Sequence, residues 1–533
     1  VDFNGATHNM VIRPDAHRSA IYGDNIVSTS QPLAAQAGIT ILSRGGNAID
    51  AAIATAAALT VVEPTMNGIG SDAFCIVWDG AELHGLNASG KYPKGWSHED
   101  FKQDQPMPID GWRSVTVPGA VSAWVELSRR FGRMKFEELF EPAIRYATEG
   151  FLVSPIIADQ WHKQLDRFNG FAEFNRIFTN QGKSPQAGDR FYLPDHANSL
   201  ERIAATHGED FYEGELARRM VEDSKKNHGQ LSLTDLHEHS PQWVAPISMN
   251  HLGLELHEIP PSGQGIATLI ALGILNQLES NPTQNSNLIE LHIEIEAMKL
   301  ALHEVYSEVG DPSHMRQTVD DLLSDDLHRA LAATISTKKT LKLETRQPVT
   351  SDTVYLTTAD SNGMMVSLIQ SNYMGFGSGI VVPNTGISLQ NRAAGFSTQR
   401  NHPNYVDGNK FPFHTIIPGF ITKNGKPLSS FGVMGGDMQA QGHLQIYRSL
   451  AKHSLDPQSL VNAPRWKLNK DGTLLVEETF GAEILNGLKS LGHEILMMPY
   501  GAYDFGAAQM ITKGTYGYAA GSEPRRDGQA VTF

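Results

Sequence analysis

Cysteine is almost absent from this chain, since Cys75 is the only one among 533 residues. No disulfide can therefore form within one chain. Cys75 lies in the apolar run AFCIVW, which predicts a buried packing role, because a free thiol usually behaves as a small apolar group. A lone cysteine is typical of a reducing compartment. We therefore expect a cytoplasmic protein, or a periplasmic or secreted one if a leader has been removed.

An excess of positive charge is also missing, as is any long apolar run. The chain has 43 basic and 58 acidic residues, which gives a formal net charge of −15. This balance argues against nucleic acid or an anionic membrane as the main partner. The longest apolar stretch, 51–62, is alanine-rich and interrupted by threonines. It is shorter than the roughly 20 residues that a membrane helix needs, so we predict no membrane span.

Several known catalytic and cofactor motifs are missing as well. The chain has no HExxH pair, and the close pairs His237 with His239 and His292 with His303 are expected to be surface or hydrogen-bonded histidines. It has no Walker A loop, and GFGSG has the wrong glycine spacing for a dinucleotide loop. PPSGQG has Pro260 where a nucleophile elbow needs its first glycine. We therefore predict no metal and no cofactor.

What the chain does contain is an ordinary globular composition, with 40% apolar and 19% charged residues. Helical periodicity dominates the first part and strands the later part, which predicts an α+β layered fold. The expected elements are helices at 32–44, 48–59, 265–275, 288–309 and 439–451, a helical region over 120–226, a hairpin turning at Asp79-Gly80, a strand at 254–259 and a polar loop over 336–352.

A strand pair is expected from Val354 to Gln370, with ADSNG at its turn, and it begins unusually. It begins with Asp352-Thr353, directly after a polar loop. An N-terminal threonine carries its own base, because its α-amine has a pKa of about 7.7–8.0. We therefore hypothesise that the chain is cut between Asp352 and Thr353, with Thr353 attacking its own preceding carbonyl.

Ordered motifs along nearly the whole chain strengthen this hypothesis. They are GGNAIDAAIATAAALTVVEPTMNGIGSDAF, VTVPGAV, IPPSGQG, IEAMKLALHEVYSEVGDP, DTVYLTTADSNGMMVS, FGSGIVVPNTGISLQN and GVMGGDMQAQGH. Together they resemble the γ-glutamyltransferase family of N-terminal-nucleophile hydrolases. The resemblance implies a four-layer αββα sandwich that matures into two subunits. These would be a large subunit, residues 1–352, and a small subunit, residues 353–533.

The resemblance also implies roles for single residues. Thr353 falls at the nucleophile, and Ser371 at the second hydroxyl, which hydrogen-bonds the nucleophile. Gly435 and Gly436 fall at the glycine pair whose N–H groups form the oxyanion hole. Asn372 falls at or beside the pocket asparagine, with one extra residue between it and the next landmark. The Gly435-Gly436 pair is also expected to form the turn before the helix at 439–451.

The substrate-binding residues depart from those of the transferases that the chain resembles. Ser89 stands at the arginine that grips the α-carboxylate, and Gly395 at the aspartate that holds the α-amino group. His414-Thr415 replace two consecutive serines. The segment between Phe396 and Pro412 is shorter than the family's lid loop, which suggests an open pocket.

Two basic residues are candidates to replace the missing contacts. Arg392 stands at a family glutamine and could bind a substrate carboxylate through both arms of its guanidinium. Lys91 could bind one as a point charge. For both residues the alternative interpretation is a surface or interface charge. This set of changes resembles the branch of γ-glutamyltransferase-like proteins, cephalosporin (glutaryl) acylases and oxamate amidohydrolases.

The sequence therefore predicts an autoprocessing threonine amidohydrolase that cleaves a small acyl or γ-glutamyl amide. Three alternatives stay open: a true γ-glutamyl transpeptidase or glutathione hydrolase, a catalytically silent member that acts as a binding protein, and a metal-dependent amidohydrolase. The expected partners are a small-molecule amide and the two subunits of one precursor. The sequence leaves the oligomeric state open, a homo-oligomer included.

Overall fold

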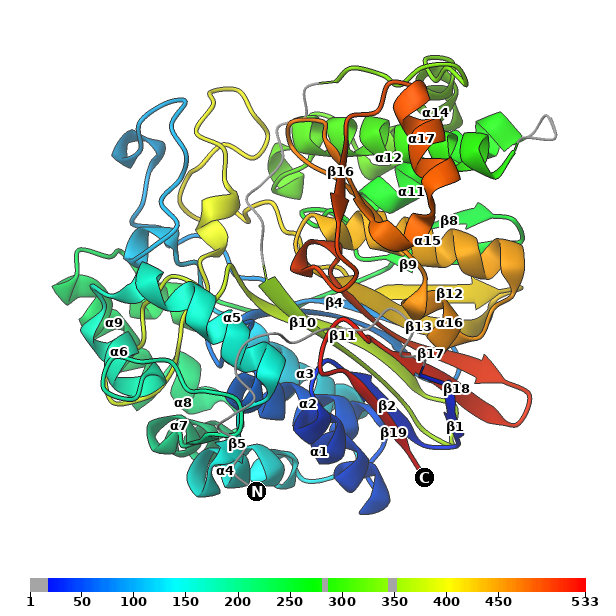
Figure 1. Cartoon of the computed structure of the whole chain (residues 1–533). Coiled ribbons are helices and arrows are strands. Elements are labelled where there is room, and N and C mark those ends of the chain that lie inside the picture. The colour runs from blue at the N-terminus through cyan, green and yellow to red at the C-terminus, as the bar shows by residue number, and fades with distance from the viewer. Residues whose placement is uncertain (1–17, 280–285, 344–351) are drawn as a thin grey trace.

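Two seven-stranded antiparallel sheets form the centre of the molecule, which is a computed structural model that describes residues 18–279, 286–343 and 352–533 (Figure 1). The first, called the β13 sheet here, has the order β1 (Ile21–Gly23), β18 (Gly517–Ser522), β17 (Ala507–Gly514), β13 (Lys426–Met434), β12 (Gly419–Lys423), β9 (Leu254–Glu258), β8 (Ile247–His251). The second, called the β10 sheet, has the order β19 (Gln529–Thr532), β2 (Ile26–Thr29), β10 (Asp352–Ala359), β11 (Met365–Tyr373), β3 (Asp72–Trp78), β4 (Leu83–Asn87), β7 (Gln242–Val244).

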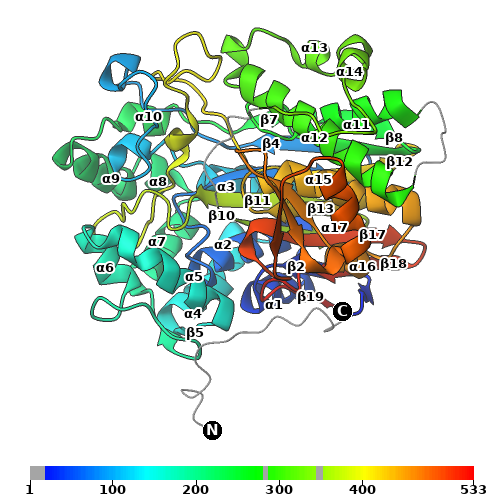
Figure 2. The same cartoon turned by 45° about the horizontal axis from the view of Figure 1, so that its top comes forward.

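Helices cover the outer face of each sheet, as both views show (Figures 1 and 2). Over the β10 sheet and beside it lie α1 (Pro32–Ser43), α2 (Ala48–Val62), α3 (Ala120–Phe131), α4 (Glu141–Glu149), α5 (Pro155–Leu165), α6 (Ala172–Phe178), α7 (Pro194–Ala205), α8 (Glu209–Tyr212), α9 (Glu215–Lys226) and α10 (Leu233–His237). On the side of the β13 sheet lie α11 (Ile266–Glu279), α12 (Asn287–Glu308), α13 (Val319–Leu322), α14 (Asp325–Ala332), α15 (Met438–His453), α16 (Pro457–Asn462) and α17 (Ala482–Ser490). Two small sheets complete the described elements: β14 (Trp466–Leu468), β15 (Leu474–Glu477) and β16 (Ile495–Met498), and β5 (Phe151–Leu152) with β6 (Arg190–Phe191).

Three apolar cores separate the four layers. One joins the helices of the first group to the outer face of the β10 sheet, and another joins the second group to the β13 sheet. The third lies between the sheets and includes Tyr355 and Phe420. Residues of β10 alternate between two of these cores, because successive strand side chains point to opposite faces. The predicted αββα sandwich is therefore confirmed.

The most buried helix is α2, and its sequence explains this position. Each of its residues from Ala48 to Val62 is buried, and many are alanine. Small side chains let the helix lie close to the sheet on one side and to the outer helices on the other. Asn47 and Asp50 form a capping box that starts the helix. The predicted helix at 48–59 is confirmed, and it continues for three more residues.

Most predicted elements are found, with differences at their ends. The hairpin at 79–80 is present as β3 and β4, and Cys75 is buried as expected. The helix expected at 439–451 is α15, which begins one residue earlier and ends two residues later. The predicted loop at 336–352 is described up to residue 343, and its part at 344–351 lies outside the described residues. Among the helices of the described ranges, none has the length and apolar character required to cross a membrane.

Candidate active site

Thr353 lies at the start of β10, beside the end of β11. The register of this strand pair shifts between Asp352 and Val354, so Thr353 lies at an irregularity of the ladder. Its Oγ1 donates a hydrogen bond to Ser371 Oγ at 3.1 Å. Ser371 Oγ also accepts the N–H of Tyr373 at 2.8 Å. The strand pair thus brings together the two hydroxyls that the sequence predicted, and both are buried.

A second group reaches Thr353 from the helix that follows β13. Gln439, in the first turn of α15, donates from Nε2 to Thr353 Oγ1 at 3.3 Å. Its Oε1 accepts the N–H of Ile417 at 2.9 Å. Its own N–H donates to the carbonyl of Gly436 at 3.2 Å. Gln439 therefore ties the nucleophile candidate to the glycine turn that precedes α15.

This turn needs glycine at both positions. Gly435 has φ 116° and Gly436 has φ 61°, and residues other than glycine rarely adopt such values. A Cβ on Gly435 would also lie 2.8 Å from the Cα of Gly506. The predicted turn before the helix is confirmed, because Met438 N–H donates to the carbonyl of Gly435.

Gln264 joins the turn to the segment that follows β9. Its Nε2 donates to the carbonyl of Thr415 at 2.6 Å and to that of Gly436 at 2.7 Å. Thr415 in turn accepts a bond from Arg392, described next. The contacts therefore close a ring, which we call the site ring: Thr353, Ser371, Tyr373, Arg392, Thr415, Gln264, Gly436 and Gln439.

Arg392 is fully buried, so the interpretation as a surface charge is wrong. It opens the short 3-10 helix Arg392–Gly395. Its Nη1 donates to Thr415 Oγ1 at 2.9 Å, and its guanidinium lies 4.2 Å from the centre of the Tyr373 ring. Buried arginines need compensation of their charge. Part of it comes from Asp72, whose Oδ2 lies 3.8 Å from Arg392 Nε.

Asp72, Arg392 and His414 form one buried charge cluster. His414 Nε2 lies 3.2 Å from Asp72 Oδ2, and its ring packs on Phe74 with a centroid separation of 4.6 Å. Burial raises the pKa of Asp72 to about 7, although the charge of Arg392 acts to lower it. Burial and the same arginine hold the pKa of His414 well below its usual value. His414 is therefore neutral at physiological pH, and Asp72 titrates there.

Several buried polar atoms around the ring have no hydrogen-bond partner among the described residues. Such atoms are rare in folded proteins, because an unpaired buried polar group costs about 1–3 kcal/mol. Atoms of this kind are available to hydrogen-bond a polar ligand. The atoms are Arg392 Nε and Nη2, His414 Nδ1, the hydroxyls of Tyr373 and Tyr306, Ser262 Oγ and Gln264 Oε1.

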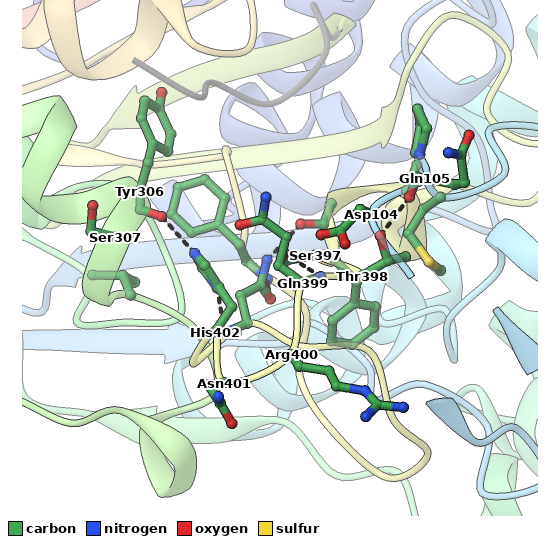
Figure 3. Close-up of a pocket in the computed structure, with 18 of the residues that line it drawn as sticks. Asp104, Gln105, Tyr306, Ser307, Ser397, Thr398, Gln399, Arg400, Asn401 and His402 are labelled. Carbon is green, nitrogen blue, oxygen red and sulfur yellow. Dashed lines mark hydrogen bonds between the residues drawn. The ribbon is translucent and has the colours of Figure 1, made fainter. Parts of the chain in front are cut away.

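A cavity of about 880 Å³ (Figure 3) is lined by Ala394 and Phe413, which lie close in sequence to Arg392 and Thr415, although no residue of the site ring lines it. Its walls come from residues 104–109, from the end of α12 and from the loop after Gly395. Tyr306 lines it, and burial raises the pKa of its phenol, with a further contribution from nearby Asp437 and Tyr373. The loop that the sequence predicted to leave an open pocket thus forms one wall of this cavity. The lining charges are mainly positive, from Arg316, Arg400 and Lys470 against Asp104.

Three of the predicted binding residues make their described side-chain contacts elsewhere. Asn372 accepts from Ser71 Oγ at 2.8 Å and donates to Ser388 Oγ at 3.4 Å. Ser89 Oγ donates to Asn87 Oδ1 at 2.7 Å. Lys91 lies over the ring of Phe411 and lines a separate pocket of about 190 Å³. The structure therefore gathers Arg392 and His414-Thr415 at the ring, whereas Ser89 and Lys91 do not line its cavity.

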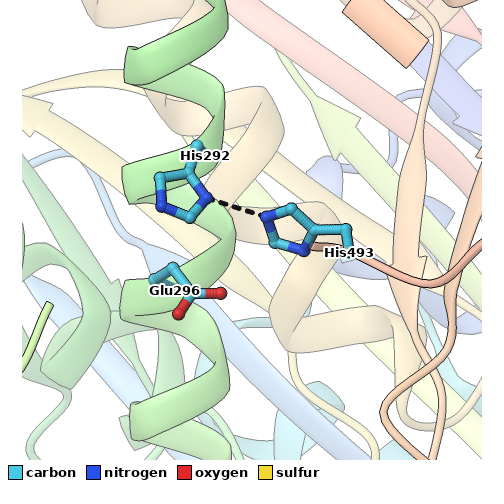
Figure 4. Close-up of side chains that lie close together, drawn as sticks. All are labelled: His292, Glu296 and His493. Atoms are coloured by element: carbon cyan, nitrogen blue, oxygen red, sulfur yellow. Dashed lines mark hydrogen bonds between the residues drawn. The ribbon is translucent and has the colours of Figure 1, made fainter. Parts of the chain in front are cut away.

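A buried group of metal-binding side chains lies on the other side of the β13 sheet (Figure 4). His292 Nδ1 lies 2.7 Å from His493 Nε2, and His292 Nε2 lies 2.8 Å from the carbonyl of Ser336. Glu296 receives Lys299 Nζ at 2.6 Å and the N–H of Leu341 at 2.6 Å. Protein groups therefore satisfy these side chains, and the lysine already supplies a cation. A second group, Asp79, Glu82 and His84, is partly exposed.

Sequence reasoning missed Asp72, Gln264, Tyr373 and Gln439. Gln264 belongs to PPSGQG, which was rejected as a nucleophile elbow and otherwise used only as a landmark of the family resemblance. Gln439 lies in GVMGGDMQAQGH, another of these landmarks, which gave it no individual role. Asp72 and Tyr373 gave no signal either, because strand position alone does not specify a partner on another element.

Comparison with known proteins places these observations in a wider context. The sequence pattern of the family described as Gamma-glutamyltranspeptidase matches residues 34–533. The chain is 34% identical to the glutathione hydrolase-like YwrD proenzyme of Bacillus subtilis (97% of this chain, 99% of the relative) and 30% identical to the oxamate amidohydrolase proenzyme of Klebsiella pneumoniae (97% and 100%). The crystal structure of cephalosporin acylase from Bacillus halodurans superimposes with a TM-score of 0.93 at 43% identity, covering 100% of this chain and 99% of that one.

Proposed function

This chain belongs to the γ-glutamyltranspeptidase family, and we propose that it is an autoprocessing amidohydrolase whose nucleophile is Thr353. Its relatives include proenzymes and an acylase by name. We propose cleavage between Asp352 and Thr353 into a large subunit, residues 1–352, and a small subunit, residues 353–533. The cleaved chain then acts on a small-molecule amide.

The chemistry follows from the groups at the ring. The α-amine released by cleavage takes the proton of Thr353 Oγ1, and Oγ1 attacks the carbonyl carbon of the amide. The carbonyl electron pair moves to its oxygen, and the N–H groups of Gly435 and Gly436 stabilise that negative charge. The C–N bond then breaks, and the leaving amine takes the proton from the α-ammonium. Water, deprotonated by the same amine, releases the acyl group from Thr353.

The contact between Thr353 and Ser371 is the single observation that carries the proposal. Thr353 is the first residue after the proposed cut, and its Oγ1 donates to Ser371 Oγ at 3.1 Å, which holds the hydroxyl in one position. A threonine that served only to fill a strand would have no need of the two hydrogen bonds that Thr353 Oγ1 makes. The catalytically silent alternative therefore has less support.

We further propose that Arg392 receives a carboxylate of the acyl group. Its Nη1 is held by Thr415, while Nε and Nη2 have no hydrogen-bond acceptor among the described residues. Two parallel donors are the arrangement that binds a carboxylate through both oxygens. Because Ser89 and Gly395 lack the charges that hold a free amino acid, an acyl group without an α-amino group is favoured over γ-glutamyl.

The test begins with Thr353→Ala. Mass spectrometry should show the wild type as fragments of 352 and 181 residues (533 − 352) and the variant as one chain. The variant should also lose activity in a screen of glutaryl, oxamate-type and γ-glutamyl amides, because it lacks both the nucleophile and the cut. Thr353→Ser serves as the control, since it keeps a hydroxyl. Full activity in a chain that is shown to be intact would overturn the mechanism.

A further inference from the structure

Gln439 is the one side chain of α15 that the described hydrogen bonds connect to the nucleophile candidate. It is fully buried and lies in the first helical turn after Gly435-Gly436. Its Nε2 and Thr353 Oγ1 are 3.3 Å apart. The predictions from the sequence gave it no role.

The orientation of its carboxamide is fixed by a backbone group. Ile417 N–H can only donate, and it points at Gln439 Oε1 at 2.9 Å. Nε2 must therefore face Thr353, and the bond to Thr353 Oγ1 is one in which Gln439 donates. A rotated amide would turn Nε2 towards the Ile417 N–H, so two donors would face each other and a buried N–H would be left unpaired, which is costly.

The second bond of the threonine hydroxyl runs the other way. Thr353 Oγ1 donates its proton to Ser371 Oγ, so Oγ1 accepts from Gln439 with one lone pair and keeps the other free. That free lone pair is the one that can attack a carbonyl carbon. Gln439 thus holds the oxygen in place without occupying the electron pair that reacts.

We propose that Gln439 is a catalytic residue that donates a hydrogen bond to the nucleophilic oxygen throughout turnover. This inference rests on the proposed function of Thr353. When the Oγ1 proton passes to the α-amine, negative charge grows on Oγ1 and the amide donor stabilises it. The same donor stabilises Oγ1 when the acyl ester breaks and the electron pair of its bond returns to this oxygen. No further reactant is required.

Gln441 provides a matched control two residues along the same helix. It is a fully buried glutamine whose Nε2 donates to the carbonyls of Asp437 and Leu468 and whose Oε1 accepts the N–H of Leu468. Its described hydrogen bonds involve neither Thr353 nor Ser371. A structural effect of removing a buried glutamine from α15 should therefore appear in both variants, and an effect on the nucleophile only in one.

The experiment compares Gln439→Met with Gln441→Met in the cleaved enzyme. The reaction is quenched, and mass spectrometry measures the fraction of the small subunit that carries an acyl group. Dividing the rate by this number of active sites gives a kcat to which unfolded or uncut protein does not contribute. For Gln439→Met we expect kcat and kcat/KM to fall together by about 10- to 150-fold, the range for a lost hydrogen bond to a charged group. For Gln441→Met we expect kcat within about 3-fold of the wild type.

Gln439→Glu is the second variant, in case the methionine variant does not fold. It keeps an oxygen for Ile417 but turns a carboxylate oxygen towards Thr353, so it should lose at least as much activity. Unchanged kcat per active site in either Gln439 variant, or equal losses in Gln439→Met and Gln441→Met, would overturn the inference alone. A wild type without amidase activity would overturn the proposed function and this inference with it.

Discussion

At the scale of single residues, Arg392 shows how burial changes an interpretation. The sequence offered a carboxylate ligand or a surface charge, and the side chain proves to be fully buried beside Asp72 and Tyr373. Burial lowers the pKa of its guanidinium to about 10, while the charge of Asp72 opposes this effect. Arg392 therefore stays charged at neutral pH, as a carboxylate ligand must.

Arg392→Lys and Arg392→Ala test this assignment. Loss of a buried charged partner costs about 2–5 kcal/mol, so kcat/KM for a glutaryl anilide should fall at least ~30-fold in both variants. Lysine cannot replace a two-armed contact with its single ammonium. The neutral valeryl anilide should change much less. Steady-state kinetics on the two substrates give the answer, and equal losses on both would make Arg392 a structural residue.

At the scale of elements, the turn between β13 and α15 sets the geometry of the site. It reverses the chain within three residues, and Gln264 clamps the carbonyl of Gly436 from another segment. The positive φ values of Gly435 and Gly436 cannot be adopted cheaply by other residues. The backbone conformation of the two glycines therefore sets the direction in which α15 begins, and with it the position of Gln439.

Gly435→Ala should damage this element. The added Cβ would meet Gly506 Cα at 2.8 Å, so the turn must shift and the N–H groups proposed for the oxyanion hole shift with it. We expect kcat to fall about 100-fold or more, the cost of a lost oxyanion donor. Gly425→Ala is the control, because it also has positive φ but an open surrounding. Similar kcat losses in both variants would point to a general effect of backbone strain.

At the scale of the whole molecule, both sheets contain strands from each side of residue 352. The β10 sheet places β10 and β11 between β2 and β3, and the β13 sheet places β12 beside β9. Two buried histidines also cross this boundary: His196 contacts the carbonyl of Gly386, and His493 contacts His292. Cleavage at residue 352 would therefore leave two chains held together by shared sheets and shared cores.

These two histidines predict how stability depends on pH. Burial lowers the pKa of His196 and of His493 from 6.5 to about 4. Below pH 6.5 these histidines bind protons in the unfolded chain but not in the folded one. The stability that the neutral histidines contribute is therefore complete above pH 6.5 and is lost as the pH falls towards 4. Protonation of each histidine should lower the free energy of unfolding by about 2 kcal/mol between pH 7 and pH 5.

Guanidinium unfolding midpoints of the uncut Thr353→Ala chain, measured from pH 7 to pH 5, would check this prediction. His493→Gln should flatten the profile, because glutamine does not titrate. His453→Gln, at the exposed last residue of α15, should leave the profile unchanged. A profile that is identical in all three chains would contradict the assigned role of His493.

The sequence by itself determined the family, the layered fold, Thr353 with Ser371, and the Gly435-Gly436 turn. Strand alternation and helix periodicity predicted a layered α+β fold, whereas the family, the four-layer order and the roles of Thr353, Ser371 and the glycine pair came from the resemblance of ordered motifs. The helix at 48–59 was also predicted, and its alanine content and its capping box agree with its buried position and with its start.

Only the tertiary structure decided what surrounds Thr353. Gln439 lies 86 residues from Thr353 in sequence, and His414 lies 342 residues from Asp72. These pairs meet because two sheets pack face to face, and no spacing rule within one strand or helix encodes such a meeting. The burial of Arg392 and the titration of Asp72 near pH 7 arise in the same way, because solvent exclusion is a property of the packed layers and not of any single segment.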